Sequence, residues 1–268
     1  MNLPPRRCLI NKKLSQSRVL ARDQQPTFFS GETVSLLFRT LLISLFFSFP
    51  VAANAGLPTL DIEYRVSKDG FNLGSNRRTL RKTGDKEYTA QAVTRAEGFA
   101  ALFVSDTVHE TSRFRLVDGQ IQPLHYRYHK KGKDPETFEV DYDRQAQVLR
   151  HSLLDETPPL QENDQDLMTF QLAMMLDLQQ SVRKLEYRIA DKKRIEDYTL
   201  IPRGKKTFDT AMGKLHTVVM EYYDQKRNRT YTFWCARELD YLPYQTRRLD
   251  SDGDKIEFKL RRYNGKSL

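Results

Sequence analysis

Residues 124–143 decide the fold class, and they read Leu-His-Tyr-Arg-Tyr-His-Lys-Lys-Gly-Lys-Asp-Pro-Glu-Thr-Phe-Glu-Val-Asp-Tyr-Asp. Apolar residues occupy every second position over 124–128 and again over 138–142. Successive side chains of a β-strand point to opposite faces of a sheet, so this period predicts two strands with one apolar and one polar face. Such half-buried strands are typical of antiparallel sheets.

The same alternation continues toward both ends of the chain. Residues 62–66 and 256–260 again place an apolar side chain at every second position. Residues that favour tight turns lie between the alternating runs: Lys68-Asp69-Gly70, Gly84-Asp85, Asp118-Gly119, Arg203-Gly204 and Asp252-Gly253. Short strands joined by such turns predict a mainly β protein built as an antiparallel meander.

One segment has the period of a helix instead. Its apolar residues recur at helical spacing after a group of capping and acidic residues: Leu167, Phe170, Met174 and Leu178 follow Asn163, Asp164 and Asp166. An Asn cap and carboxylates in the first turn both stabilise a helix start. The sequence therefore predicts one long helix over 164–179. A cluster of Ala and Phe without alternation predicts a second, short helical turn over 98–104.

The strand pattern resumes after the helix, and no Gly/Ser-rich linker interrupts it. Residues 56–268 are therefore expected to form a single β-rich domain. A dozen or so strands in one sheet predict a strongly curved sheet or an open barrel, with its apolar face inward. The long helix is expected to pack on that apolar face or across the mouth.

Residues 1–55 are predicted to be a secretion signal segment. The apolar run over 41–49 is too short to span a bilayer as a helix, and small residues follow it at Ala53-Asn54-Ala55. This pattern predicts cleavage between Ala55 and Gly56. The polar stretch before it is long for a leader, which favours a true translation start near residues 34–36.

The predicted leader also explains most of the positive charge. The chain has 44 basic and 35 acidic residues, a formal net charge of +9. Seven of the basic and two of the acidic residues lie in residues 1–55, so the remainder carries 37 and 33, a net charge of +4. That balance is ordinary for a soluble domain and argues against nucleic acid as a partner. We expect a periplasmic protein that is soluble after cleavage, with no membrane span in the mature chain.

Several short motifs resemble one family of exported bacterial proteins. They are Ile62-Glu-Tyr-Arg-Val66, Gly119-Gln-Ile-Gln-Pro-Leu-His-Tyr126, Asp166-Leu-Met-Thr-Phe170, Met212-Gly-Lys-Leu-His-Thr-Val218, Phe233-Trp-Cys-Ala236 and Leu242-Pro-Tyr244. In this order they are similar to the family catalogued as domain of unknown function 3108. The resemblance implies a periplasmic, mostly antiparallel β protein and carries no established activity. The layout also resembles the open barrels of periplasmic lipoprotein carriers, which is an analogy of architecture alone.

No pattern in the sequence indicates a catalytic or metal site, and no cofactor is expected. His125 and His129 share a strand face, but they lie about 13 Å apart at 3.3 Å per residue, too far to bind one metal ion. No Gly-x-Ser-x-Gly motif is present, and Cys235 lies among strand-forming residues, where we expect a buried, inert thiol. We expect carboxylates on the strands to be solvated, although two of them could converge as in a glycosidase.

The aromatic and Met residues remain as candidates for a ligand cavity: Tyr126, Tyr128, Phe138, Tyr142, Phe170, Met174 and Trp234. They either fill a core or bound an apolar cavity, in which flexible Met side chains adapt to a ligand. The leading hypothesis is a non-enzymatic periplasmic binding or carrier protein for an apolar ligand, such as lipid or a lipidated protein. The alternatives are an envelope interaction or assembly factor with a filled core, and a hydrolase acting on envelope glycans or lipids.

Overall fold

The computed structural model describes residues 57–102, 105–182 and 184–268. The predicted signal segment, residues 1–55, lies outside the described residues, as does the expected cleavage site before Gly56.

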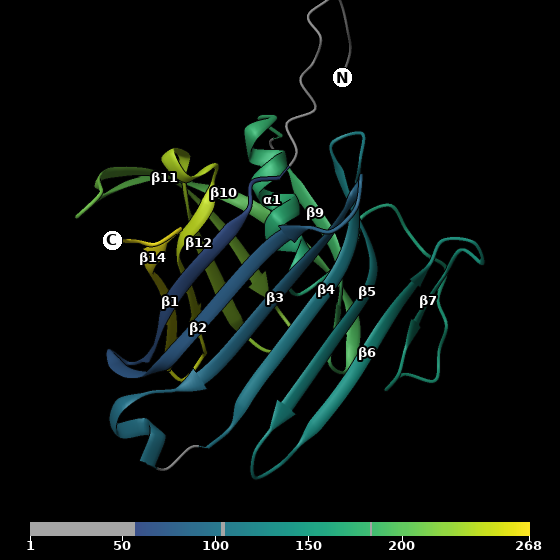
Figure 1. Ribbon diagram of the computed structural model, residues 1–268, viewed down its shortest axis with the longest axis horizontal. Coiled ribbons are helices and arrows are strands. Elements are labelled where there is room, and N and C mark those ends of the chain that lie inside the picture. Colours follow the sequence, from purple (N-terminus) through teal and green to yellow (C-terminus); the bar gives the residue numbers. More distant parts are fainter. Residues whose placement is uncertain (1–56, 103–104, 183) are drawn as a thin grey trace, which may run out of the picture. The chain divides into compact units, whose positions relative to one another are not determined.

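The described chain is built almost entirely of strands (Figure 1). The first group comprises β1 (Leu60–Lys68), β2 (Phe71–Lys82), β3 (Glu87–Ala96), β4 (Thr107–Val117), β5 (Gln120–Lys131), β6 (Glu136–Asp143) and β7 (Val148–His151). The second comprises β8 (Asp164–Asp166), β9 (Leu185–Asp191), β10 (Arg194–Thr210), β11 (Gly213–Asp224), β12 (Arg229–Ala236), β13 (Leu242–Leu249), β14 (Lys255–Tyr263) and β15 (Lys266–Ser267). The helical elements are α1 (Thr169–Gln179) and the 3₁₀ turns η1 (Gly98–Leu102) and η2 (Arg237–Leu239).

All the strands belong to one sheet, in the order β7-β6-β5-β4-β3-β2-β1-β14-β13-β12-β11-β10-β9-β8, with β15 paired to β14. Two meanders, β1 to β7 and β8 to β14, are thus joined by the β1–β14 pair. The pairs are antiparallel except for β8 and β9, which run parallel. The sheet path ends at β7 and β8, which are not joined by a backbone ladder in the described residues, so the sheet is not closed.

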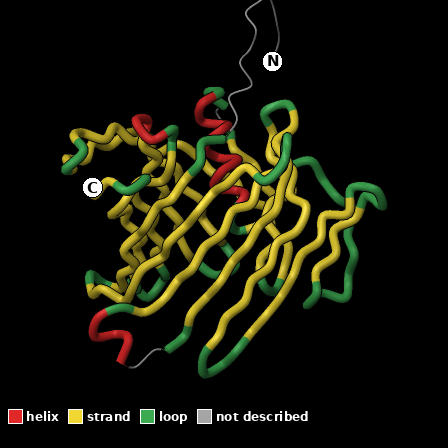
Figure 2. The backbone as a smooth tube through the Cα atoms, in the orientation of Figure 1, coloured by secondary structure: helices red, strands yellow, loops and turns green. Residues whose placement is uncertain are grey.

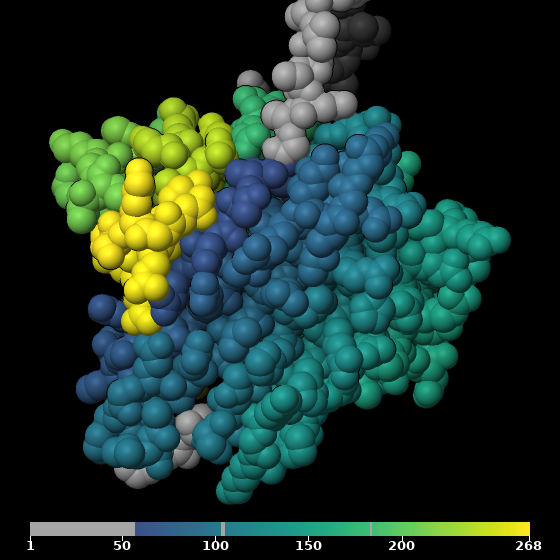
Figure 3. Space-filling view, in the orientation of Figure 1, coloured from purple at the N-terminus to yellow at the C-terminus, as the bar shows by residue number. Residues whose placement is uncertain are grey.

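The strands predicted from alternation are confirmed. In β1 the residues at even positions from Leu60 to Val66 are buried, and in β6 Phe138, Val140 and Tyr142 are buried. The outer faces of the first strands, β1 to β6, form one continuous surface in Figure 3. This division between faces matches the predicted mainly β, antiparallel protein.

Most of the predicted turns are hairpin turns. Asp69 and Gly70 both have positive φ, and so do Asp118 and Gly119, as a type I′ turn requires. The prediction of a turn at Arg203-Gly204 was wrong, because Gly204 lies inside β10. The β10–β11 register shifts between Pro202 and Gly204, and Gly204 has a φ of +117°, so these residues form a β-bulge.

The core surrounds α1 within the curve of the sheet (Figures 1 and 2). Its buried side chains are Thr169, Phe170, Leu172, Ala173, Met174, Met175, Leu176 and Leu178, so the helix is covered on every side. α1 contacts β5, β8, β9 and β13, which belong to both meanders. Within the described ranges, no helix is long and apolar enough to cross a bilayer.

The helix starts later than the sequence predicts. Residues 164–166 form β8, and α1 begins at Thr169. Asp166 Oδ1 accepts hydrogen bonds from the backbone N–H groups of Met168 and Thr169, and Thr169 Oγ1 accepts one from the N–H of Asp166. This reciprocal arrangement has the geometry of a capping box. Asp166 was therefore correctly predicted to stabilise the helix start, whereas Asp164 lies in β8 and binds Arg188, and the predicted cap at Asn163 was wrong. The predicted short helical turn is confirmed as η1 over 98–102.

Candidate functional site

Four of the predicted cavity residues lie where the two ends of the sheet meet. A small apolar cluster there, called the seam below, contains Tyr126, Phe138, Val140, Tyr142, Leu149 and Ala190, with Tyr128 and Ile195 at its margin. Ala190 in β9 neighbours Ile189, which belongs to the larger cluster around α1. Adjacent strand residues point to opposite faces, so the inner face of β5 to β7 covers the outer face of β9. The seam aromatics thus fill an overlap between the sheet ends.

Polar contacts tie the seam together. The Ser112 hydroxyl of β4 donates to Asp166 Oδ2 at 2.6 Å, and the Gln165 amide donates to the backbone oxygen of Ile121 in β5 at 3.1 Å. Arg188 of β9 forms a two-pronged ion pair with Asp164, at 2.5 and 2.8 Å, and both side chains are largely buried. Side-chain contacts thus close the side of the sheet that lacks a backbone ladder.

Two titratable groups of the seam are displaced from their ordinary pKa. Burial raises the pKa of Asp166 to about 6, although hydrogen bonds from Ser112, Thr169 and Met168 oppose this. Burial lowers the pKa of His151, which stacks on Phe138 at 5.3 Å. The N–H of Leu153 donates to His151 Nδ1, so Nε2 carries the proton that is donated to the backbone oxygen of Asp191. In this geometry the side chains of Asp166 and His151 both hold neighbouring segments together through hydrogen bonds.

The other three predicted cavity residues lie elsewhere. Phe170 and Met174 belong to the cluster around α1, where Phe170 meets Tyr198 and Phe233 edge-on, with ring centroids 6.1 and 5.8 Å away. Trp234 belongs to neither apolar cluster. It follows Phe233 and points to the opposite, outer face of β12, where Arg247 and Lys206 cover its ring at 5.0 and 5.9 Å. The structure therefore does not bring the seven residues together, and Trp234 does not bound the interior.

A cavity of about 250 Å³ lies inside the sheet at the N-terminal end of α1 and is called the lumen cavity below. It is lined by Arg78, Leu167, Phe170, Gln171, Asp191, Tyr198, Tyr231, Phe233, Thr246, Arg248, Ile256 and Phe258. These residues come from α1, the segment before it, and six strands of both meanders: β2, β9, β10, β12, β13 and β14. Seven of the twelve lining residues are aromatic or aliphatic, and the other five are polar or charged.

Arg78 is the polar group at the α1 end of the lumen cavity. Its Nε donates to Asn76 Oδ1 at 2.6 Å, its Nη1 donates to Gln171 Oε1 at 2.7 Å, and its guanidinium lies 5.0 Å from the centre of the Tyr64 ring. It also lines a small adjoining cavity of about 40 Å³. Among the described residues, Arg78 has no carboxylate within ion-pair distance. A partly buried guanidinium held by neutral amides keeps its full positive charge available to an anion.

The charged groups at the other end of the lumen cavity are already paired. Arg248 contacts Asp250 at 3.0 Å, and Asp191 contacts Arg227 at 3.4 Å. Nearby in sequence to Asp191, Arg194 pairs with the largely buried Glu196 at 2.7 Å. The lining cation Arg248 thus contacts a carboxylate, unlike Arg78.

Arg78 is not among the residues that the sequence analysis proposed for the cavity. One signal was present: Asn76, Arg78 and Leu80 alternate, and Leu80 is buried. That period places Arg78 on the inner face. The aromatic lining of β10, β12 and β14 was also missed, since alternation gives the face of a residue but not the space beside it.

The histidines on β5 have separate partners on the outer face. His125 lies 3.7 Å from Glu139, and His129 Nδ1 lies 2.7 Å from the Thr137 hydroxyl. In the part of the chain that the structure describes, no group of three or more His, Cys, Asp or Glu side chains could hold a metal ion. Cys235 is buried there without a disulfide.

Comparisons with known proteins place the fold and the family. No functionally curated protein matches the sequence. The crystal structure of a beta-barrel-like protein of domain of unknown function DUF1849 from Brucella abortus is similar, with a TM-score of 0.50 and 14% identity. The match covers 78% of this chain and 98% of that one, and at this identity it supports the fold alone. The family model described as a protein of unknown function (DUF3108) matches residues 61–261, so the chain belongs to the DUF3108 family.

Proposed function

We propose that the chain is a non-enzymatic periplasmic binding or carrier protein whose lumen cavity takes an apolar ligand with an acidic group. The observation that carries the proposal is Arg78, a cation without a carboxylate partner in a cavity whose lining is mostly aromatic and aliphatic. An acidic head group would pair with Arg78, and its apolar chain would lie along Tyr198, Phe233 and Phe258. Ligand sites are typically apolar cavities with a few polar groups that fix orientation.

The size of the lumen cavity limits what it can take. At the roughly 30 Å³ that a water-sized group occupies in a liquid, about 250 Å³ holds eight or so such groups, which is about the size of an acid with eight carbons. This volume suits a short fatty acid, or the terminal part of a longer acyl chain of a lipid or lipidated protein. Whole phospholipids would need the cavity to widen.

In this proposal α1 is a fixed inner wall at one end of the barrel rather than a lid. Eight of its eleven residues are buried, and its C-terminal end is held by the Gln179 amide, which donates to the backbone oxygen of Asp240. Burying each large apolar side chain contributes about 1.5–3 kcal/mol, so releasing the whole helix is costly. The ligand would therefore enter from the rim near Asp191 and Arg248.

One observation favours the alternative of an interaction or assembly factor. Phe71 and Leu102 are 77% and 74% exposed, and they lie on β2 and η1, which contact each other. Exposed large apolar side chains in one region are typical of protein interaction surfaces. In that case the filled core around α1 would serve stability alone.

Thermal unfolding with a matched ligand pair tests the proposal. Octanoate and octanol share the apolar chain, but only octanoate can pair with Arg78. A ligand that binds only the folded state at about 100 times its Kd stabilises by about 2.7 kcal/mol. We expect octanoate to raise the Tm more than octanol does, and Arg78→Gln to abolish the difference. Arg81→Gln, an exposed Arg on the same strand, is the control that should behave as the wild type.

Trp234 is a poor reporter of this event because it lies on the outer face. A Tyr231→Trp variant places an indole in the lining of the lumen cavity. Its emission should shift with octanoate, whereas the emission of Trp234 in the wild type should not. An equal response to both ligands would contradict the role of Arg78, and no response in any variant would favour the interaction-factor alternative.

A further inference from the structure

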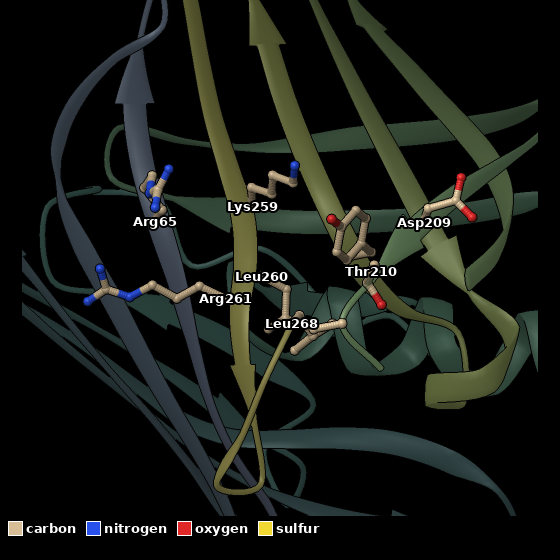
Figure 4. Close-up of a pocket in the computed structure, with 9 residues that line it drawn as sticks. Arg65, Asp209, Thr210, Lys259, Leu260, Arg261 and Leu268 are labelled. Carbon is tan, nitrogen blue, oxygen red and sulfur yellow. The ribbon is translucent and has the colours of Figure 1, made fainter. Parts of the chain in front are cut away.

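A second pocket interrupts the wall of the sheet and is called the wall notch below. On one edge of β14, the ladder with β13 ends at the pair Gln245–Lys259. The next strand paired along that edge is β15, and its first pair involves Arg262. A pocket of about 490 Å³ lies near this gap (Figure 4). It is lined by Arg65, Asp209, Thr210, Ala211, Tyr244, Lys259, Leu260, Arg261 and Leu268.

Two exposed cations lie on neighbouring strands at the wall notch, and in Figure 4 the Lys259 side chain extends from β14 toward Tyr244. Arg65 of β1 and Lys259 of β14 are directly opposite in the antiparallel register, and both are exposed. Neither forms an ion pair with any carboxylate of the described residues. Like charges in directly opposed positions repel each other and lower the stability of a sheet. An unbalanced cation pair of this kind suits the binding of an anion.

The third cation of the wall notch is already neutralised. Arg261 pairs with Glu63 and, at 3.2 Å, with Glu97. In Figure 4 its side chain leaves β14 on the side opposite to that of Lys259. Asp209 supplies the one carboxylate side chain of the lining, and it forms no ion pair with Arg65 or Lys259. The free charge of the pocket is therefore carried by Arg65 and Lys259, and it exceeds that of Asp209.

The floor of the wall notch is apolar. Tyr244 and Leu260 belong to the core, and Leu268 packs against it. The centres of the Tyr244 and Phe208 rings are 4.8 Å apart, and Lys259 Nζ lies 5.8 Å from the centre of the Tyr244 ring. A ligand with an anionic group and a ring or short apolar part could therefore place its anionic group at the cations and its apolar part on this floor.

We propose that the wall notch binds a phosphate ester, whose phosphate contacts Arg65 and Lys259 while its organic part lies over Tyr244. The Arg fork matches the geometry of phosphate oxygens, and the Lys ammonium adds a second positive charge. Such a phosphate could belong to a soluble metabolite or to a lipid head group. This site is separate from the lumen cavity, with which it shares no lining residue.

Calorimetric titration with three probes tests the proposal: phenyl phosphate, inorganic phosphate, and vesicles of phosphatidylglycerol in phosphatidylcholine. The test variant is Arg65→Gln with Lys259→Gln. The control, Lys131→Gln with Lys193→Gln, removes the same charge from exposed positions outside the pocket. We expect phenyl phosphate to bind more tightly than inorganic phosphate, because only phenyl phosphate uses the apolar floor. The test variant should bind it at least about tenfold more weakly, while the control matches the wild type.

The outcomes separate the two sources of phosphate. Binding of phenyl phosphate that depends on Arg65 and Lys259 supports a soluble ester. Binding to the anionic vesicles alone, with the same dependence, supports a lipid head group. Equal binding by the test variant and the control, or no binding of any probe, would overturn the proposal. A readout without ligand guards against misfolding: Arg65→Gln should keep or slightly raise the Tm, because it removes the repulsion from Lys259.

Discussion

The Ser112 hydroxyl lies 2.6 Å from Asp166 Oδ2 and donates a hydrogen bond to it, which joins β4 to β8 across the open side of the sheet. Both residues are fully buried. The other carboxylate oxygen of Asp166 accepts the N–H groups of Met168 and Thr169 at the start of α1. One side chain thus fixes both the closure of the sheet and the position of its internal helix.

This placement predicts an unusual pH dependence. Burial raises the pKa of Asp166 from 3.8 to about 6, so the folded state binds this proton more tightly than the unfolded state does. The stability that the proton provides is therefore fully present below about pH 4 and is lost as the pH rises through about 6. The shift corresponds to about 3 kcal/mol. Asp166→Asn keeps hydrogen-bonding groups but does not titrate. The free energy of unfolding of the variant should therefore increase relative to that of the wild type as the pH rises.

Urea unfolding of both proteins between pH 4 and 7.5 measures this difference and cancels the other titrating groups. A constant gap between the two curves would show that Asp166 is not the group responsible.

The buried pair of Asp164 and Arg188 predicts a large effect of breaking it on one side. Asp164→Ala leaves the Arg188 guanidinium buried without its carboxylate and should lower the free energy of unfolding by about 3–5 kcal/mol. Replacing both, with Asp164→Leu and Arg188→Met, should cost clearly less. Chemical denaturation checks this, with Asp61→Ala, which breaks an exposed pair with Arg77, as a control expected to cost below about 1 kcal/mol. A double variant as unstable as Asp164→Ala would argue against a desolvated pair.

Phe170 should be the most sensitive position of α1. Its ring packs edge-on against Tyr198 and Phe233, so Phe170→Ala is expected to cost about 3–5 kcal/mol. Phe71→Ala, at a residue that is 77% exposed, should change stability by less than about 0.5 kcal/mol. The same denaturation experiment compares them. Similar small losses for both would mean that α1 is not packed as described.

Cys235 should react with thiol reagents only after unfolding. It is fully buried, and burial raises the pKa of its thiol, which disfavours the reactive thiolate. The rate of labelling should therefore rise with denaturant in parallel with global unfolding. Rapid stoichiometric labelling in native buffer would show that this part of β12 is open.

The sequence predicted the strands well because alternation is a local signal. Residues 62–66, 124–128, 138–142 and 256–260 all lie in strands, and most of their apolar side chains belong to the core clusters or pack against them; Leu124, at the register shift between β4 and β5, does not. The helix was wrongly predicted to start at Asp164. Residues 164–166 instead form β8, which is held by β9, and no local sequence pattern reveals this distant partner. The family resemblance was also correct, since the motifs span most of the matched region, residues 61–261.

The candidate site was harder to predict because it depends on which faces meet. Tyr126, Phe138 and Tyr142 do face inward, but β9 covers them at the seam. In β12 both Phe233 and Trp234 are large and apolar, so their alternation could not say which one points to the interior. Arg78 was not singled out from the sequence, and its position beside Gln171 of α1 comes from the structure.

The central claim is that Arg78 makes the lumen cavity a site for an acidic amphiphile, and carbon-13 NMR of octanoate labelled at its carboxyl carbon tests it most directly. Free octanoate, titrated under the same conditions, gives the reference pKa. Pairing with Arg78 should hold the pKa of the bound carboxyl below that of free octanoate, and Arg78→Gln should remove this shift while Arg81→Gln retains it. A bound carboxyl that titrates like free octanoate in the wild type, or the absence of any bound resonance, would contradict the account.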